Sequence, residues 1–295
     1  MSLPPASLIV SSRDRPGMLM DLVSSVLAGD EVPAEMIVVD QSREPHPVLS
    51  NGVDARVRYV WSRSVGLSRS RNIGIREADH EVVTFMDDDI RVPPRWFGTL
   101  VSSLVAAGPR SVVIGRVLAG EPEVAGGFSP SGMHGGQRQH AVYAGRIGRD
   151  VMYANMALPR SAFLEVGLFD ERLGAGAKFP SSEDNDLGFR LLEAGYRIVT
   201  VPEALVYHRA WRQPGDYVPL RWRYGRGQGA YYAKHLGWHD RYMLERLRWD
   251  VGRHLSRIPS RVRSGMRRQA CGDLAYVAGL VAGAAEWLLT ERRGN

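Results

Sequence analysis

The sequence predicts an α/β protein, with a mixed, mostly parallel β-sheet flanked by helices and a helical extension at the C-terminal end. Three observations support this prediction. Short apolar runs rich in β-branched residues alternate with segments whose apolar residues recur at helical spacing. The first three segments have the order and length of a β-α-β unit. Beyond residue 211 the chain becomes arginine-rich with helical periodicity.

The predicted elements follow from these runs in chain order. Residues 7–12 and 35–40 are buried-strand runs, and Pro16 suits the first turn of the helix predicted at 16–28 between them. We next expect a strand at 57–61, a helix at 67–78, a strand at 82–86, a helix at 94–107 and a strand at 111–117. A helix at 160–166, a second helix after an acidic start at 183, and a strand at 197–201 complete the predicted sheet region.

One stretch and one boundary complete the organisation. Residues 115–148 contain many glycines and few periodic apolar positions, which indicates either a functional loop or a surface insertion. We expect an α/β domain over residues 1–211 and a basic, mainly helical extension over residues 212–295.

Composition limits the class of protein. A chain of 295 residues with 44% hydrophobic content can bury a full core. The single cysteine, Cys271, excludes an intramolecular disulfide and a cysteine-based zinc site, which fits a reducing compartment. The first residues lack the basic start and long apolar middle of a secretory signal, so we expect a cytoplasmic location or a peripheral one on the inner face of the membrane.

The basic charge is concentrated in one segment. Residues 212–268 hold 14 basic and 4 acidic side chains, whereas residues 1–211 hold 22 and 25. The net charge of +6 therefore belongs to the extension, and it carries no information about a site in the sheet region.

The run VVTFMDDDIRVPP, residues 82–94, places three aspartates directly after a buried strand. Adjacent carboxylates repel one another unless a cation or bound water compensates them. At the carboxyl edge of a parallel sheet such a cluster would hold a ligand. The alternative is a solvated turn, because aspartate and proline both favour turns.

Further polar groups end the neighbouring strands. Ser11, Ser12 and Arg13 follow the first strand, and Asp40 ends the second. Arg69 and Arg71 lie at a helix start, where arginine can bind phosphate or be exposed to solvent. Glu183 and Asp184 open a later helix, either as favourable caps or as a general base. His208 follows a last apolar run, as a hydrogen-bonded residue or a metal ligand.

The order of these blocks resembles that of family 2 glycosyltransferases of the GT-A fold. The resemblance covers residues 6–211 and rests on SLIVSSRDRP, IVVDQS, GLSRSRNIGI, VVTFMDDDIRVPPRW, YANMALPRSAFLEVGLFDERLGAG and SEDNDLGFRLLEAGYRIVTVPEALVYH. It implies transfer of a sugar from a nucleotide-diphosphate sugar to an acceptor hydroxyl, with inversion and with Mg²⁺ or Mn²⁺ as cofactor.

The resemblance also assigns expected roles by matching position. Ser11, Arg13 and Asp40 match residues near the base and ribose, and Arg71 with Asn72 matches a step beside the diphosphate. Asp87 and Asp89 match the D-x-D pair, with Asp88 in the variable slot of the donor site; Asp87, Asp89 and His208 are the expected metal ligands. Asp184 matches the catalytic base, and Asp186 is a second candidate for part of that role. Gly176, Glu183, Asp186 and Trp211 are expected at the acceptor side or in a lid, since residues 174–182 resemble a wall that closes over the donor.

The extension has two candidate membrane-active segments. Residues 241–257 place apolar residues on one helical face beside arginines, before Pro259 interrupts the pattern. The apolar run at 274–285 is expected to be too short to span a bilayer. These segments are expected either to lie on an anionic membrane surface or to pack against the body of the protein or a second copy in a homodimer. No nucleic-acid recognition motif is evident, so nucleic acid is not an expected partner.

The expected partners are therefore a UDP, dTDP or GDP sugar and a saccharide, lipid-linked or small-molecule acceptor. Two other functions remain open from the sequence. A nucleotidyltransferase would share the parallel sheet and the carboxylates but would release pyrophosphate. A non-catalytic protein that binds sugar nucleotides or membranes would bind donor without turnover.

Overall fold

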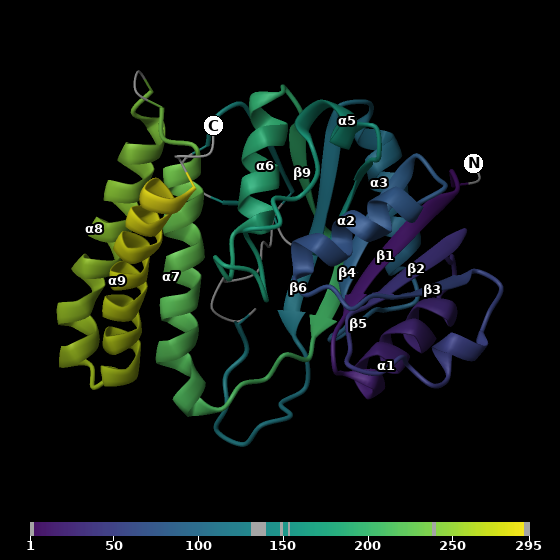
Figure 1. Ribbon diagram of the computed structural model, residues 1–295, viewed down its shortest axis with the longest axis horizontal. Helices are drawn as coiled ribbons and strands as arrows, with labels where there is room; N and C mark the ends of the chain where they lie inside the picture. Colours follow the sequence, from purple (N-terminus) through teal and green to yellow (C-terminus); the bar gives the residue numbers. More distant parts are fainter. Residues whose placement is uncertain (1–2, 131–139, 148–149, 153, 238–239, 292–295) are drawn as a thin grey trace.

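The structure is a computed structural model that describes residues 3–130, 140–147, 150–152, 154–237 and 240–291 (Figure 1). Among these residues one nine-stranded sheet has the order β3-β2-β1-β4-β8-β6-β9-β5, and β7 pairs with β9. The strands are β1 Ala6–Ser12, β2 Glu35–Asp40, β3 Val57–Trp61, β4 Val82–Asp87, β5 Ile90–Arg91, β6 Ser111–Ala119, β7 Ala141–Ala144, β8 Met156–Pro159 and β9 Arg197–His208.

Helices cover both faces of the sheet and form a separate group beside it (Figure 1). They are α1 Pro16–Leu27, α2 Leu67–Glu77, α3 Trp96–Ala107, α5 Ala162–Val166, α6 Glu183–Glu193, α7 Tyr217–Lys234, α8 Tyr242–Arg263 and α9 Arg267–Thr290, with short 3₁₀ turns η1 Leu49–Asn51 and η2 Pro214–Asp216. The predicted fold class, a mixed and mostly parallel sheet flanked by helices with a helical C-terminal region, is confirmed.

The sheet is mixed because three short strands, β5, β7 and β8, pair antiparallel to their neighbours. β1 is parallel to β2 and β4, β2 is parallel to β3, and β6 is parallel to β9. β8 lies between β4 and β6 and is antiparallel to both. The sequence prediction missed β5, β7 and β8, since runs of two to four residues do not show a period.

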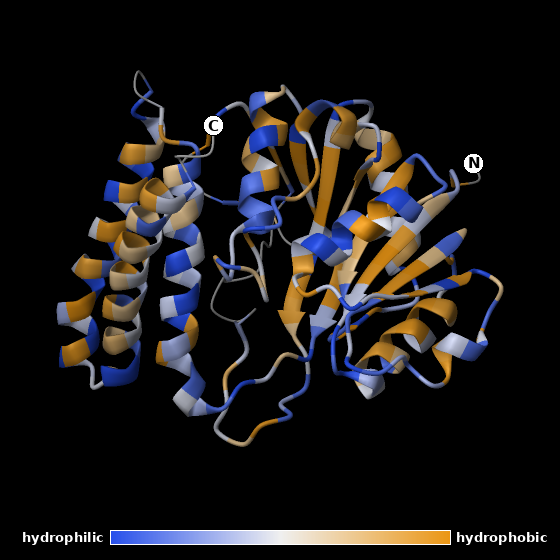
Figure 2. Cartoon of the chain, viewed as in Figure 1, coloured by the Kyte–Doolittle hydropathy of each residue, from blue (hydrophilic) through white to orange (hydrophobic). Residues whose placement is uncertain are grey.

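The core forms two layers because side chains alternate across each strand. Leu8 and Val10 of β1 pack with α1 and α3 on one face, whereas Ile9 packs with Phe85 and Leu187 on the face covered by α2, α5 and α6. Figure 2 shows the central strands as mostly hydrophobic, whereas the helices beside them carry both hydrophilic and hydrophobic residues. Burial on both faces explains why the strands are continuous apolar runs.

The C-terminal helices pack closely through glycine. A Cβ atom on Gly225 would lie 2.1 Å from the Tyr276 carbonyl oxygen, and one on Gly229 would lie 2.0 Å from that of Leu280. α7 and α9 can therefore approach at backbone distance only without side chains at these positions. Phe179, from the sheet region, packs on Trp287 of α9 with ring centroids 5.2 Å apart, which joins the helices to the body.

Two expectations for this region were wrong. α8 does not stop before Pro259 but continues through it to Arg263. Pro259 is exposed, so water can bond to the Leu255 carbonyl that loses its helical partner. The expected short apolar run is part of a 24-residue helix, α9, which is long and apolar enough to cross a membrane, although 39% of its apolar window is buried in the structure. A helix packed inside a protein passes the same test of length and composition.

Candidate active site

The carboxyl ends of β1, β2 and β4 lie level at one edge of the sheet. In the strand register, Ser11 pairs with Asp87 and Ser12 pairs with Asp40. The sequence prediction that these polar groups share an edge follows from the parallel pairing. The loops after these strands therefore build one site from residues distant in the chain.

A cleft of about 340 Å³ opens beside the ends of β1 and β2, lined by Ser12, Asp40, Ser42 and the loop from Arg43 to Pro47. Asp40 is buried at its wall, where its Oδ2 accepts a hydrogen bond of 2.7 Å from the Tyr59 hydroxyl. Arg13 does not join this group. Its side chain is exposed and its Nε lies 3.6 Å from the Asp14 carboxylate.

The aspartate triplet is paired with cations. Ser12 Oγ donates to Asp88 at 2.8 Å, and Arg15 Nη1 donates to Asp88 at 3.0 Å and to Asp89 at 2.7 Å. His208 Nε2 lies 3.1 Å from Asp89 Oδ1. Arg15 is thus a site residue that the sequence analysis missed, since its partners follow more than 70 positions later.

The neighbouring carboxyl groups differ in acidity. Burial and the adjacent Asp89 charge raise the pKa of Asp88 to about 6. Burial also acts to raise the pKa of Asp89, but the hydrogen bond with His208 and the charges of His208 and Arg15 outweigh it and lower that pKa to about 2. Asp89 therefore stays ionised to a lower pH than Asp88 does.

The residues expected to hold a metal do not all converge. Asp87 Oδ1 instead accepts from Arg71 Nη2 at 3.1 Å, and within the described ranges no group of three or more His, Cys, Asp or Glu side chains is placed to hold a metal ion. Asp89 Oδ1 is buried, and the group that faces it is His208 Nε2 at 3.1 Å. Asp89 and His208 therefore fit as two ligands of a cation, and Asp87 lies in a second group.

Arg71 is the centre of that second group. Its guanidinium is buried, with Nη1 donating to Asp184 at 2.7 Å and Nη2 donating to Asp87 at 3.1 Å. Glu183 Oε1 lies 3.7 Å from Nη1. One guanidinium thus compensates three carboxylates, and the group retains surplus negative charge that faces the strand edge.

Crowding and burial make two of these groups stronger bases. Burial raises the pKa of Glu183 to about 7, with the Asp184 charge adding to the rise. Burial also raises the pKa of Asp184, although the Arg71 charge opposes it. Asn72 does not face this group, because its amide bonds to the backbone of Phe169 at 2.9 and 3.0 Å.

Asp186 has a different environment from Asp184. It is 0% exposed, and its carboxylate lies 2.7 Å from Lys234 Nζ, 2.7 Å from His235 Nε2 and 2.9 Å from Arg190 Nη2. Although burial acts to raise the pKa of Asp186, the bond from His235 and the three charges lower it well below its usual value. The Asp186 oxygens accept bonds that join α6 to α7. They are therefore not free to take a proton, as a general base must.

Residues 173–182 form a loop that leads into α6, directly before Glu183 and Asp184. Gly174 and Gly176 have φ of +104° and +79°, which favour glycine, and Leu67 N donates to the Ala175 carbonyl at 2.9 Å. Trp211 directly follows the extended β9, and its indole Nε1 is buried without a hydrogen-bond partner in the described part of the chain. The structure thus places Gly176 next to the start of α2, where a Cβ on it would lie 3.4 Å from Gly66 Cα.

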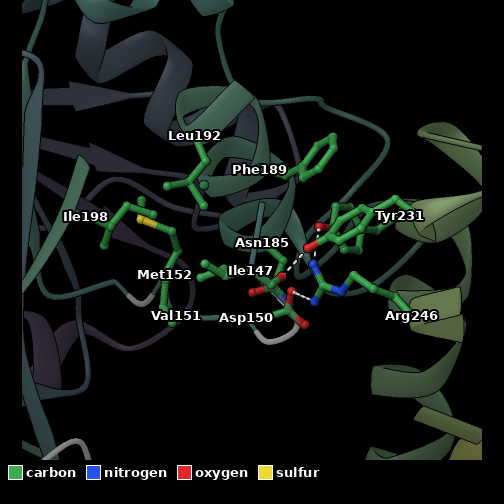
Figure 3. A pocket seen from close by; sticks show the side chains of 12 residues that line it. Ile147, Asp150, Val151, Met152, Asn185, Phe189, Leu192, Ile198, Tyr231 and Arg246 are labelled. Carbon is green, nitrogen blue, oxygen red and sulfur yellow. Dashed lines mark hydrogen bonds and ion pairs between the residues drawn. The ribbon is translucent and has the colours of Figure 1, made fainter. Parts of the chain in front are cut away.

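A polar junction behind α6 ties the site to the C-terminal helices (Figure 3). Gln228 of α7 accepts from Ser182 Oγ at 2.7 Å and from Asn185 Nδ2 at 2.9 Å, and donates to Asp150 at 2.7 Å. Arg246 of α8 points at the same Asp150 and at the Tyr231 hydroxyl. The cavity between them holds about 10 Å³, room for one water at most, so this is a packed junction.

The sequence matches the family described as glycosyl transferase family 2 over residues 7–167, more than half of the chain. The protein belongs to glycosyl transferase family 2. The resemblance inferred from the motifs is thus confirmed.

Several curated relatives of this glycosyltransferase are known. It is 29% identical to the O-antigen biosynthesis protein RfbC of Myxococcus xanthus over 73% of its own length, but it spans only 18% of that protein. It is 27% identical to the glucosyl-dolichyl phosphate glucuronosyltransferase of Haloferax volcanii, over 71% of each. It is 32% identical to the succinoglycan biosynthesis protein ExoA of Rhizobium meliloti over 62% of its own length and 54% of that protein.

Solved structures share the fold of this glycosyltransferase. The mannosyltransferase PcManGT from Pyrobaculum calidifontis, in complex with GDP-Man and Mn²⁺, aligns with a TM-score of 0.60 at 18% identity, over 99% of this chain and 81% of that one. S. aureus TarS in complex with UDP aligns with a TM-score of 0.55 at 14% identity, over 99% and 92%. The fold is therefore GT-A, and the alignments include the C-terminal helices.

Proposed function

We propose that this family 2 glycosyltransferase moves a hexosyl group from a nucleotide-diphosphate sugar to an acceptor hydroxyl, with inversion and with Mg²⁺ or Mn²⁺. The observation that carries the proposal is the placement of Asp184. Its carboxylate opens α6 at the strand edge, shares Arg71 with Asp87, and has a raised pKa. A group in that position can accept a proton near the end of β4.

The donor occupies the strand edge in this proposal. The base and ribose lie in the cleft beside Ser12, Asp40 and the loop after β2, and the diphosphate lies toward the aspartate triplet. The complexes of PcManGT with GDP-Man and of TarS with UDP support a nucleotide donor, which is a UDP, dTDP or GDP sugar here. Asp88 and Ser12 line this path.

Asp89 and His208 would hold the cation. The buried Oδ1 of Asp89 would be one oxygen ligand, and the imidazole of His208 would be one nitrogen ligand. The donor phosphates and water would supply the other ligands. The bound cation supplies neutralisation of the charge that develops on the departing nucleoside diphosphate. The Mn²⁺ in the PcManGT complex supports this assignment. Asp87 acts indirectly in this proposal: it bonds to Arg71, which lies beside the diphosphate end of the donor.

Asp184 is the proposed base. The acceptor oxygen attacks the anomeric carbon from the face opposite the diphosphate, its proton passes to the Asp184 carboxylate, and the bond from the anomeric carbon to the phosphate oxygen breaks. One displacement inverts the configuration. Arg71 keeps Asp184 ionised, while burial keeps its pKa high enough to accept a proton. Glu183 holds a shared proton in this crowded pair, and the Asp186 contacts hold the helix in place.

The remaining expectations complete the proposal. The loop around Gly176 borders the donor and excludes water from it. Trp211 borders the acceptor entrance after β9. The acceptor is a saccharide, a lipid-linked sugar or a small molecule. Residues 1–211 act as the catalytic domain, and residues 212–295 support it. The name of the Haloferax relative, a glucuronosyltransferase of glucosyl-dolichyl phosphate, favours the lipid-linked acceptor among these.

The substitution Asp184→Asn tests this proposal. It keeps the shape and the contact to Arg71 but removes the base, so donor turnover should fall by roughly 10²–10⁴-fold while donor binding persists. Nucleotide release and donor affinity are measured on the same samples. Asp30→Asn, an exposed change at the opposite edge of the sheet, is the matched control. Unchanged turnover in Asp184→Asn would reject the assigned base, and no turnover in the parent with normal binding would favour a non-catalytic protein.

A further inference from the structure

The turn that joins α8 to α9 is a basic and apolar surface. We name residues 255–268 the hairpin tip. No acidic residue occurs between Asp250 and Asp273, although six arginines do. Leu255, Val262 and Met266 are 43%, 54% and 43% exposed within the tip. Aliphatic side chains exposed among arginines give this surface both the charged and the apolar groups that an interfacial segment needs.

Most arginines of the hairpin tip form no ion pair with the described residues of the protein. Elsewhere in the extension, Arg226 bonds to Glu286 at 2.7 Å and Arg246 bonds to Asp150. Within the tip, Arg261 lies 2.8 Å from Asp273. Arg257, Arg263 and Arg267 are exposed and make no ion pair with any described residue. The tip holds five of the 14 basic side chains of residues 212–268 and none of the 4 acidic ones, so it has a high density of positive charge.

A short series of contacts links the tip to the site. The Arg268 guanidinium lies 5.6 Å from the Tyr217 ring centroid, and that ring lies 5.2 Å from the Phe128 ring. Phe128 exchanges backbone hydrogen bonds of 3.1 and 2.9 Å with Arg212, four positions after His208. Figure 1 shows the turn between α8 and α9 on the same side of the molecule as the carboxyl ends of β4 and β6.

We propose that the hairpin tip docks on the surface of an anionic lipid bilayer. Its arginines contact lipid phosphates, while Leu255, Val262 and Met266 lie at the headgroup boundary. Docking there turns the strand edge toward the membrane, so the acceptor of the proposed function is a sugar or hydroxyl carried on a membrane lipid. The inference therefore rests on the proposed function and names its acceptor class.

The chemistry of the tip favours lipid over other anionic or apolar partners. Residues 251–272 contain no Phe, Tyr or Trp, so the tip lacks the aromatic platforms on which unpaired bases stack. A second copy of the tip would bring like charges together, which opposes self-association through this surface. Exposed aliphatic side chains within an arginine cluster instead match a charged headgroup layer above acyl chains.

Vesicle co-sedimentation of the full chain tests the proposal. The protein should bind vesicles of equal parts phosphatidylcholine and phosphatidylglycerol, bind phosphatidylcholine alone far more weakly, and release with added salt. The double variant Arg263→Glu with Arg267→Glu should bind the anionic vesicles roughly 20-fold or more weakly, because each basic side chain near such a surface contributes about fivefold. Met266→Asp, which changes one charge and one apolar contact, should weaken binding less.

A charge-matched variant separates the tip from net charge. Arg241→Glu with Arg248→Glu reverses the same number of exposed arginines on α8, away from the tip, and should bind within about twofold of the parent. Equal losses in both double variants would overturn the tip assignment. So would equal binding to uncharged vesicles, tighter binding to single-stranded RNA than to anionic vesicles, or a dimer in sedimentation equilibrium that the tip variant dissociates.

A donor-binding measurement keeps this inference separate from the proposed function. Thermal stabilisation by a nucleoside diphosphate with Mn²⁺ should be the same in the parent and in both double variants. If vesicle binding is absent while this stabilisation persists, docking fails and the proposed function stands. If vesicle binding follows the tip but no nucleotide stabilises the parent, the proposed function fails at its donor site.

Discussion

Two carboxylates in the first turn of α6 have opposite environments. Asp186 is enclosed by Arg190, Lys234 and His235, and its pKa is lowered. Asp184, two positions earlier, shares the single guanidinium of Arg71 with Asp87 and Glu183, and its pKa is raised. Asp186 thus lies in a cluster with enough cations to compensate its charge, whereas Asp184 lies in a cluster with surplus negative charge.

The difference separates a structural role from a chemical one. A carboxylate with a surplus of cations is held ionised and has no lone pair left to take a proton. A carboxylate in a cluster with surplus negative charge destabilises the fold slightly and is ready to bind a cation, a diphosphate or a proton. Natural sites often accept such a cost in stability, so the two clusters can be distinguished by stability as well as by activity.

The largest expected effect on stability is that of Asp186→Asn. It leaves buried Lys234, His235 and Arg190 with less counter-charge and should lower the free energy of unfolding by about 3–5 kcal/mol. Urea unfolding at neutral pH measures it. Asp184→Asn, the matched change, should be neutral or stabilising, because it relieves repulsion with Glu183. An equal loss in both variants would remove the distinction between the clusters.

The pH dependence of stability should follow Glu183. Its pKa is about 7 in the folded protein and about 4.5 in the unfolded chain, so the folded state holds the extra proton between these values. Stability should therefore fall as pH rises from about 4.5 to 7, by at most about 1.4 kcal/mol per pH unit for one proton. Glu183→Gln should reduce this slope in urea unfolding across that range, while the raised pKa of Asp88 leaves a smaller slope of the same sign. A slope of unchanged size in the variant would assign the proton elsewhere.

A smaller effect is expected at the junction behind α6. Gln228→Ala removes the acceptor shared by Ser182 and Asn185, which should cost about 1–3 kcal/mol because buried donors are left unpaired. Since Ser182 precedes Glu183 and Asp184, donor turnover should fall while nucleotide affinity stays the same. Gln228→Glu keeps the acceptor oxygen but sets a carboxylate against Asp150, so it should not restore the turnover. A change in nucleotide affinity would instead place Gln228 at the donor.

The sequence predicted the groups that depend on chain order. The aspartate triplet, Asp40 and Ser11 lie at one edge because parallel strands end together, and a run of apolar residues marks each strand. Arg15 and Gln228 could not be found this way. Their partners are 73 and 46 positions away, and an arginine or glutamine beside an ordinary helix carries no local pattern.

Other differences have the same origin in tertiary contacts. Arg71 was expected at a diphosphate but lies between Asp184 and Asp87, because α6 brings its carboxylate to the start of α2. Asn72 was expected beside it but bonds to the Phe169 backbone. α8 continues through Pro259 since that turn is exposed, and burial rather than helical periodicity decides where a helix can lose a hydrogen bond.

The most direct test of the strand-edge site is a thermal-shift panel of UDP, dTDP, GDP and CMP, each with and without Mn²⁺, on the parent and on Asp89→Asn. One nucleoside diphosphate should stabilise the parent in a metal-dependent way, because it binds the folded state alone. Asp89→Asn should lose the metal-dependent part of the shift. If no nucleotide shifts the parent even with Mn²⁺, or if Asp89→Asn responds as the parent does, the site does not hold the donor and metal at these residues.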